Sequence, residues 1–201
     1  MANHGTGEVK KTIMKESMRL FLANGFQGTS VKEITEAARI GRGTLYWYFK
    51  SKNEIVESII GEFDSRFVEG LIRAVESCKG DFVAKFKTFH RFATEFARDN
   101  TDLSLVFNTL LNEIVGTNTL VEKLAKASYE RYRRVIENIL EEGKRDGSVK
   151  PEIDAALYAH IVIASHTGML VAWLVNRDAL DVRAFVNAFR DLILKGVTDC
   201  Q

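Results

Sequence analysis

The segment TSVKEITEAARIGRGTLYWYFKSK, residues 29–52, contains two short stretches of helical periodicity separated by a turn. In the second stretch a cation, a hydroxyl and three aromatic residues fall within seven positions, around only two residues of core type, Leu45 and Phe49. Because a helix exposes most of its circumference, these polar and aromatic side chains cannot all pack inward. The segment therefore predicts a helix–turn–helix whose second helix, 42–49, presents side chains suited to a nucleic-acid groove.

The residues before this segment predict a supporting helix over 8–23. Asn24-Gly25 is a typical end of a helix, and we expect Gly25 to adopt the left-handed conformation. Thr29 or Ser30 is expected to cap the first helix of the helix–turn–helix, and Ser30 followed by Glu33 fits the capping box. A turn over 39–41 then leads into the third helix.

Beyond residue 52 the pattern is helical throughout, with one proline in the whole chain and no sustained alternation. The sequence predicts an all-α protein: a three-helix DNA-binding head over 1–52, followed by a larger helical domain for effector binding and dimerisation over 53–201. Helices are expected over 54–78, 82–98, 102–115, 119–145, 152–176 and 182–197.

The charge of the chain is unevenly distributed. Residues 1–52 contain nine Lys and Arg against four Asp and Glu, a net charge of +5, whereas residues 53–201 contain nineteen against twenty-three, a net charge of −4. A basic head on an acidic body indicates that the head meets a polyanion.

Other classes of protein are disfavoured. Hydrolase, nucleotide-binding and zinc-protease motifs are absent from the sequence, and the four histidines lack metal-ligand spacing, so neither an enzyme nor a cofactor or metal site is expected. The apolar stretch 155–176 contains two histidines and reads as a buried or interface helix rather than a membrane span. No secretion signal is recognised, and a cytoplasmic location is expected, with Cys78 and Cys200 free and reduced; a redox pair is the alternative.

Residues 25–56 resemble the DNA-binding head of the tetracycline-repressor (TetR-like) family. The residues that carry the resemblance are Gly25-Phe26, Thr29-Ser30, Ile34, Ala37-Ala38, Gly43-Thr44-Leu45-Tyr46, Tyr48-Phe49 and Lys52. The resemblance implies a homodimeric repressor that binds a palindromic operator in double-stranded DNA and responds to a small molecule. Two residues depart from the family pattern: Arg39 replaces the usual turn glycine and is expected to have a positive φ, and Gly41 replaces a capping hydroxyl.

The candidate DNA contacts combine this resemblance with the chemistry of the side chains. Arg42 suits guanine O6 and N7, Thr44 suits a thymine methyl or a phosphate, and the tyrosine hydroxyls suit phosphates. Lys52 lies at a helix N-terminus, which favours a bound phosphate. Trp47 has two open alternatives, a groove contact or burial against the first helix. The full set is Ser30, Lys32, Arg42, Gly43, Thr44, Tyr46, Trp47, Tyr48 and Lys52.

The larger domain supplies candidates for two further surfaces. An aromatic, largely apolar effector pocket is predicted from Phe63, Phe67, Phe86, Phe89, Phe107, Leu110, Tyr129, Tyr132, His166 and Met169; ordinary core packing is the alternative for each. A four-helix interface between two subunits is predicted from Tyr158, Val162, Ser165, Trp173, Phe185 and Phe189. The rival reading of the whole chain is a helical interaction module or small-molecule-binding protein without specific DNA binding.

Overall fold

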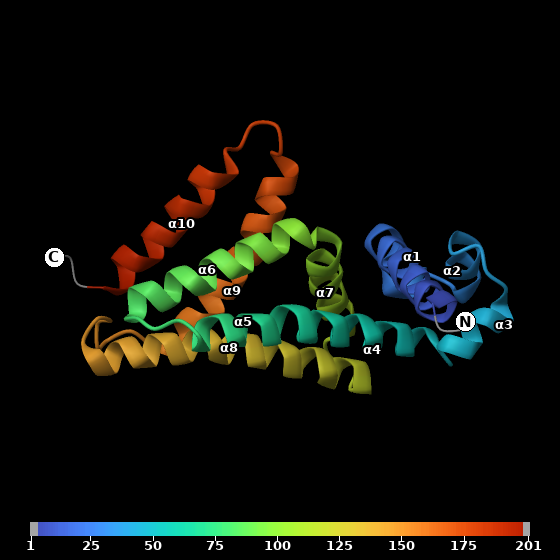
Figure 1. The fold of residues 1–201 in the computed structure, drawn as a ribbon, viewed down its shortest axis with the longest axis horizontal. Helices are drawn as coiled ribbons and strands as arrows, with labels where there is room; N and C mark the ends of the chain where they lie inside the picture. Colours follow the sequence, from blue (N-terminus) through green and yellow to red (C-terminus); the bar gives the residue numbers. More distant parts are fainter. Residues whose placement is uncertain (1–3, 199–201) are drawn as a thin grey trace. The chain divides into compact units, whose positions relative to one another are not determined.

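The computed structural model of the protein describes residues 4–198, and every regular element within that range is a helix (Figure 1). The prediction of an all-α fold is therefore confirmed. Cys200, predicted to be reduced, lies outside the described residues. The first four helices are α1 (His4–Gly28), α2 (Val31–Ala37), α3 (Arg42–Tyr48) and α4 (Lys52–Phe63).

The later helices agree closely with the predicted boundaries. They are α5 (Glu69–Glu76), α6 (Phe82–Asp99), α7 (Thr101–Ile114), α8 (Leu120–Asp146), α9 (Ala155–Val175) and α10 (Val182–Val197).

One predicted helix is interrupted. The run expected over 54–78 consists of α4, a π-helical turn over Asp64–Val68, and α5. The prediction of one α-helix was wrong there because an i→i+5 turn of five residues differs too little in period to appear in the spacing of apolar residues.

The two local signals at the ends of α1 and α2 are confirmed. Gly25 has φ 74° and ends the regular part of α1, although helical hydrogen bonding resumes to residue 28. Ser30 accepts a hydrogen bond from the Glu33 amide, and the Glu33 carboxylate accepts one from the Ser30 amide. This capping box fixes where α2 begins.

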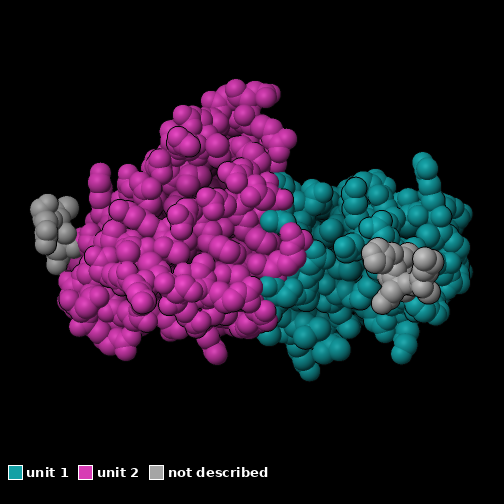
Figure 2. Space-filling model, viewed as in Figure 1, with its two compact units in different colours: residues 1–65, 100–128 teal, residues 66–99, 129–201 magenta. Residues whose placement is uncertain are grey.

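The chain forms two compact units, coloured separately in Figure 2: residues 1–65 with 100–128, and residues 66–99 with 129–201. In the first unit, α1 packs against α2, α4 and α7, and α4 also contacts α7. In the second unit, α6 contacts α5, α9 and α10. The first unit thus contains the predicted head and, in addition, α4, α7 and the first part of α8.

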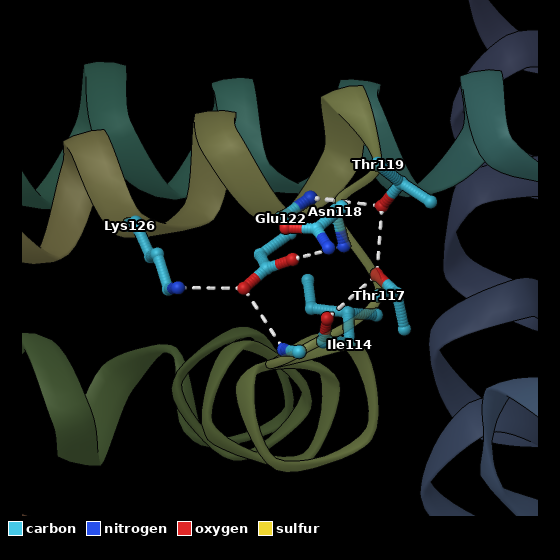
Figure 3. A network of polar contacts seen from close by, with 7 residues as sticks. Ile114, Thr117, Asn118, Thr119, Glu122 and Lys126 are labelled. Carbon is cyan, nitrogen blue, oxygen red and sulfur yellow. Dashed lines mark hydrogen bonds and ion pairs between the residues drawn. The ribbon is translucent and has the colours of Figure 1, made fainter.

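The turn between α7 and α8 is held by one buried carboxylate. Glu122 is 3% exposed and accepts hydrogen bonds from the amides of Gly116 (2.9 Å) and Asn118 (2.6 Å), with the Lys126 ammonium 2.6 Å away (Figure 3). Both amides belong to residues with positive φ. The hydrogen bonds from Lys126 and the two amides lower the pKa of Glu122 to about 2. A charged carboxylate therefore stabilises a turn that otherwise leaves two amides without partners.

Candidate nucleic-acid interface and ligand cavity

Helix α3 begins after a turn of unusual backbone. Arg39 has φ 54°, which confirms the positive φ expected because the residue replaces the turn glycine of the family it resembles. Gly41 precedes the helix in an extended conformation and makes no side-chain capping bond. The helix is instead anchored by its two core residues, since Leu45 and Phe49 are 0% and 2% exposed.

The remaining side chains of α3 face solvent except Tyr48, which is partly exposed. Arg42, Gly43 and Thr44 are exposed, Tyr46 is 41% exposed and Trp47 is 71% exposed. The exposure of Trp47 excludes burial against α1, because a ring buried there would be largely inaccessible, and the groove contact remains a prediction. Its indole instead stands edge-on to the Tyr48 ring, with centroids 4.6 Å apart.

Arg42 and Tyr46 interact with each other one turn apart. The guanidinium lies 5.6 Å from the centroid of the Tyr46 ring, and its Nη2 donates a long hydrogen bond of 3.4 Å to the tyrosine hydroxyl. Such contacts restrict the rotamers of a long side chain and so reduce the entropy lost when it binds a partner.

The candidates before α3 are partly engaged within the protein. The Ser30 hydroxyl donates to the Glu33 carboxylate at 2.7 Å as part of the capping box. Hydrogen bonds from Ser30 lower the pKa of Glu33. Lys32 is exposed and lies 3.8 Å from Glu36, a surface pair that is broken easily. As DNA contacts both Ser30 and Lys32 remain predictions.

Lys52 makes a different set of contacts from the one expected. Its ammonium donates to the carbonyls of Phe26 at 2.6 Å and Thr29 at 2.7 Å, and it lies 4.3 Å from the centroid of the Phe26 ring. Burial lowers the pKa of this amine, while Glu113 and Glu33 raise it. Two of its three donors are thus occupied inside the protein.

The second unit contains an apolar cavity of about 60 Å³ between α6, α9 and α10. Its lining is Ala93, Thr94, Ala97, Arg98, His166, Met169, Leu170, Trp173, Val182, Phe185 and Val186. Polar groups are confined to few positions, as is common where a protein binds an apolar group.

A cationic groove adjoins this cavity along α6 and α10. It encloses about 570 Å³ and shares Thr94, Arg98, Val182 and Val186 with the cavity. Five cations line it against one acid, Glu95; the cations are Lys87, Arg91, Arg98, Arg183 and Arg190. Sequence reasoning missed this groove, although Lys87, Arg91 and Arg98 recur on one face of α6 at helical spacing.

A series of partly buried hydrogen bonds runs beside the cavity and joins α6, α8, α9 and α10. His90 Nε2 lies 2.9 Å from the Val186 carbonyl, His90 Nδ1 lies 2.9 Å from His166 Nε2, and His166 Nδ1 lies 3.1 Å from the Tyr132 hydroxyl. A carbonyl only accepts, so His90 donates from Nε2, His166 donates from Nε2, and Tyr132 donates its proton. Every ring nitrogen is satisfied only if both histidines are neutral.

The environment favours that neutral state. Burial and the neighbouring His90 lower the pKa of His166 to about 3. Burial lowers the pKa of His90, although its bond to the Val186 carbonyl acts in the opposite direction. Burial also raises the pKa of Tyr132, so its hydroxyl keeps its proton.

The predicted pocket residues are divided between the two units. His166 and Met169 line the cavity. Phe63 stacks on Phe107 with centroids 3.8 Å apart in the first unit, where Leu110 is also buried. The others pack in the second unit: Phe67, Phe86, Phe89 and Tyr132 are buried, and Tyr129 contacts His160. As ligand contacts these residues remain predictions.

The predicted subunit-interface residues are also distributed over several environments. Val162 is buried within the protomer at 1% exposure, whereas Tyr158, Ser165 and Phe189 are partly exposed. Trp173 and Phe185 line the cavity. The exposed face of α9 consists of other residues, Leu157, Ile161, Ala164, Gly168, Val171 and Val175. Their spacing of three and four could have identified this face from the sequence.

Two family models cover the chain. The one described as bacterial regulatory proteins, tetR family, matches residues 13–59, and the C-terminal region of YsiA-like proteins matches residues 63–196. The chain belongs to the TetR family. It is a DNA-binding transcriptional regulator, as its exposed α3 and its basic head predicted.

Individual relatives agree over nearly the full length. The chain is 25% identical to the fatty acid metabolism regulator protein of Bacillus subtilis (strain 168), over 92% of this chain and 93% of that protein. The MbdR regulator from Azoarcus sp. CIB has the same fold, with a TM-score of 0.83, 24% identity and coverage of 95% of this chain and 100% of that one. FadR from Bacillus subtilis, solved with stearoyl-CoA, gives a TM-score of 0.75 at 22% identity, with coverage of 92% and 98%. The curated relative is named as a regulator, not as an enzyme, as expected for this chain.

Proposed function

We propose that this regulator is a homodimeric repressor of the cytoplasm that binds a palindromic operator and is released from it by an acyl-CoA thioester. The observation that carries the effector proposal is that an apolar cavity adjoins a cationic groove, with four residues lining both. The similarity in fold to FadR from Bacillus subtilis, solved with stearoyl-CoA, supports the same class of effector.

The DNA-binding part of the proposal rests on α3. Its exposed side chains are a cation, a hydroxyl and aromatic rings with polar atoms, while Leu45 holds the helix from below. In the major groove Arg42 would read guanine, Thr44 would contact a thymine methyl, and the hydroxyls of Tyr46 and Tyr48 would position the helix on phosphates. Trp47, being exposed, is available to pack along the sugar-phosphate backbone.

The groove and cavity together suit an amphiphilic anion. Coenzyme A carries a diphosphate and a 3′-phosphate, which match the five cations of the groove, and its acyl or aryl group matches the apolar cavity. Lys87, Arg91 and Arg183 have no ion-pair partner among residues 4–198, so they offer charge without first breaking a contact. An uncharged steroid would leave that charge unused.

The size of the cavity implies that binding changes the protein. A volume of about 60 Å³ is well below the ~150 Å³ of a cavity that holds benzene. An acyl or aryl group therefore enters only if α6, α9 and α10 separate, which also strains the bond between His90 and the Val186 carbonyl. We infer that the ligand shifts the population toward a state whose two heads no longer match successive major grooves.

The dimer proposal rests on the exposed face of α9. This helix is long and apolar enough to span a membrane, and 28% of its most apolar window is buried. Val171 and Val175 are 48% and 76% exposed, and Ala164 and Gly168 lie between larger residues on the same face. Small residues allow two helices to approach closely, so a second copy of this face is a suitable partner.

The effector proposal is tested by titrating a complex of the protein and a selected operator duplex with thioesters. Fluorescence anisotropy would be followed with isovaleryl-CoA, benzoyl-CoA, stearoyl-CoA and free CoA. At least one thioester is expected to release the duplex, while free CoA does not, because it lacks the group that opens the cavity. Release by none of the thioesters would contradict the proposal.

A variant with a matched control locates the site. Replacing Arg91 and Arg183 together by Glu is expected to raise the thioester concentration needed for release by an order of magnitude or more, with operator affinity unchanged. Lys123→Glu reverses an exposed charge on α8 that does not line the groove and serves as the control. Equal effects of both changes would mean that the groove does not bind the coenzyme.

The dimer is tested by sedimentation of two valine variants. Val171→Glu is expected to give a monomer that binds operator at least a hundredfold more weakly, because a charge at the interface must be desolvated. Val115→Glu changes an equally accessible valine, 56% exposed, outside α9 and is expected to remain dimeric. A dimeric Val171→Glu variant would exclude this face as the interface.

A further inference from the structure

The segment after the bend in α1 is held from its amide side by a residue of α7. The Glu113 carboxylate accepts hydrogen bonds from the Phe26 amide at 3.0 and 2.9 Å and from the Gln27 amide at 3.1 Å. The approach is close, since a Cβ atom on Gly25 would lie 2.8 Å from Glu113 Oε1. Gly25 is therefore required both for its φ of 74° and for the space that the carboxylate occupies.

The same segment is held from its carbonyl side by the first residue of α4. The Lys52 ammonium donates to the carbonyls of Phe26 and Thr29 and lies over the Phe26 ring. That ring is 7% exposed and packs edge-on against Phe21 with centroids 5.6 Å apart. Residues 25–29 thus have an anion on one side and a cation on the other.

This segment leads directly into the helix–turn–helix. Thr29 is 1% exposed and its hydroxyl donates to the Gly25 carbonyl at 2.7 Å, which leaves the bend little freedom. The next residue, Ser30, caps α2, and α2 packs on α3. The direction in which the chain leaves the bend therefore determines the orientation of α2 and α3.

We propose that Glu113 and Lys52 are positioning residues for DNA binding, which clamp residues 25–29 and so fix the orientation of α2 and α3 without touching DNA. Glu113 lies on α7, far outside the predicted head of residues 1–52, and would connect that helix to the DNA-binding surface. Lys52 acquires a role different from the phosphate contact that the family resemblance implied. The proposal rests on the proposed function only for its operator-binding readout.

The two possible roles of Lys52 differ in their dependence on salt. A phosphate contact releases a counterion, so its loss lowers the slope of log K against log[salt] by about 0.9. A positioning residue releases none, so Lys52→Met is expected to lower operator affinity on the order of tenfold with the slope unchanged. Lys32→Ala, at an exposed lysine with no such buried contacts, is the comparison expected to reduce the slope. A slope reduced by about one in Lys52→Met would overturn the positioning role.

Glu113 is tested by Glu113→Gln and Glu113→Ala, with Asn112→Ala on the same helix as the control. Both Glu113 variants are expected to bind operator on the order of tenfold more weakly at an unchanged salt slope. Combined with Lys52→Met, the losses should be less than additive, because both residues hold one segment. Full operator affinity in both Glu113 variants, or strictly additive losses, would contradict the clamp.

Hydrogen exchange of the free protein tests the clamp independently of operator binding. In the wild type the amides of Phe26 and Gln27 are expected to exchange slowly, and Glu113→Gln is expected to accelerate them while α9 amides keep their rates. This result stands even if no specific duplex is found, in which case the proposed function fails and the clamp does not. Unchanged exchange at these two amides would refute the clamp even if operator binding is confirmed.

Discussion

Helices α3 and α6 are both rich in aromatic residues, yet they bury them to opposite extents. Tyr46 and Trp47 on α3 are 41% and 71% exposed, whereas Phe86 and Phe89 on α6 are fully buried. The aromatic residues of α6 recur at spacings of three and four and share one face, but those of α3 are consecutive and point in different directions. The spacing of aromatic residues, more than their number, separates a core helix from one that presents a binding surface.

The largest expected effect on stability comes from removing a buried ring of α6, compared with removing an exposed ring of α3. Phe89→Ala removes a fully buried ring and should lower the free energy of unfolding by about 3–5 kcal/mol. Trp47→Ala should change it by less than about 0.5 kcal/mol and weaken operator binding instead. Urea denaturation of both variants measures the difference. Similar stability losses would mean that the exposed ring contributes to the core after all.

The next prediction concerns the polar side of α3. Arg42→Ala should weaken operator binding by about 1–3 kcal/mol and relax the base preference at one position of each half-site, because a guanidinium discriminates guanine. Anisotropy with the operator and with single-base variants measures this. Arg19→Ala, an exposed arginine of α1 paired with Glu16, is the control and should bind as the wild type does. Undiminished binding by Arg42→Ala would contradict the placement of α3 in the major groove.

A third change tests the hydrogen bonds that link His90, His166 and Tyr132. His166→Phe leaves His90 Nδ1 and the Tyr132 hydroxyl without hydrogen-bond partners and should lower the free energy of unfolding by about 1–3 kcal/mol at pH 7. His160 is exposed on the same helix, so His160→Phe leaves these hydrogen bonds intact and serves as the control. A His166→Phe variant as stable as the wild type would show that these hydrogen bonds contribute nothing to the stability of the fold.

The pH dependence follows from the directions of the pKa shifts. The pKa values of His90 and His166 are lowered in the folded state. As the pH falls below about 6.5, these histidines are therefore protonated in the unfolded state before they are protonated in the folded state. Their stabilising contribution is complete above that pH and is lost as the pH falls, for His166 through its folded pKa of about 3. His166→Phe should therefore lose less stability between pH 7 and pH 4 than the wild type. An equal loss would contradict the buried neutral pair.

The turn held by Glu122 gives a smaller effect in the first unit. Its pKa of about 2 lies below the ordinary value, so its contribution is complete above about pH 4.5 and is lost as the pH falls toward 2. Glu122→Gln should lower the melting temperature by several degrees at pH 7 and by less at pH 3. Glu141→Gln, an exposed carboxylate of the same helix, should change neither. A pH-independent difference would rule out the charge as the cause.

The smallest effect lies in the turn before α3. Arg39→Gly removes the steric cost of a side chain at φ 54° and should raise the free energy of unfolding by about 0.5 kcal/mol, after the greater chain entropy of glycine is subtracted. Arg39→Ala keeps the Cβ atom and should resemble the wild type in urea denaturation. A destabilised Arg39→Gly variant would mean that the arginine side chain makes a contact that outweighs its backbone strain.

The sequence predicted the features that depend on neighbouring residues. Most helix boundaries, the bend at Gly25 and the capping box of Ser30 follow from residues within four positions of each other, whereas the positive φ of Arg39 was expected from the resemblance to a family that usually has glycine there. The exposed surface of α3 was predictable for the same reason, since only Leu45 and Phe49 were available as anchors.

Features that join distant parts of the chain were not predictable. The contacts of Glu113 span 87 positions along the sequence, and the bond between His90 and the Val186 carbonyl spans 96. The groove needs the cations of α6 and α10 together, and neither helix alone reveals it. The role of Lys52 depends on where the carbonyls of Phe26 and Thr29 point, which no local pattern specifies.

The most direct test of the central claim is selection of bound duplexes from random DNA at physiological salt. A repressor dimer is expected to enrich a palindrome whose half-sites are centred one helical turn, or a multiple of it, apart, and to lose it from the bound fraction when the releasing acyl-CoA is added. Binding of all duplexes alike, or enrichment of a single asymmetric site that no thioester affects, would contradict it.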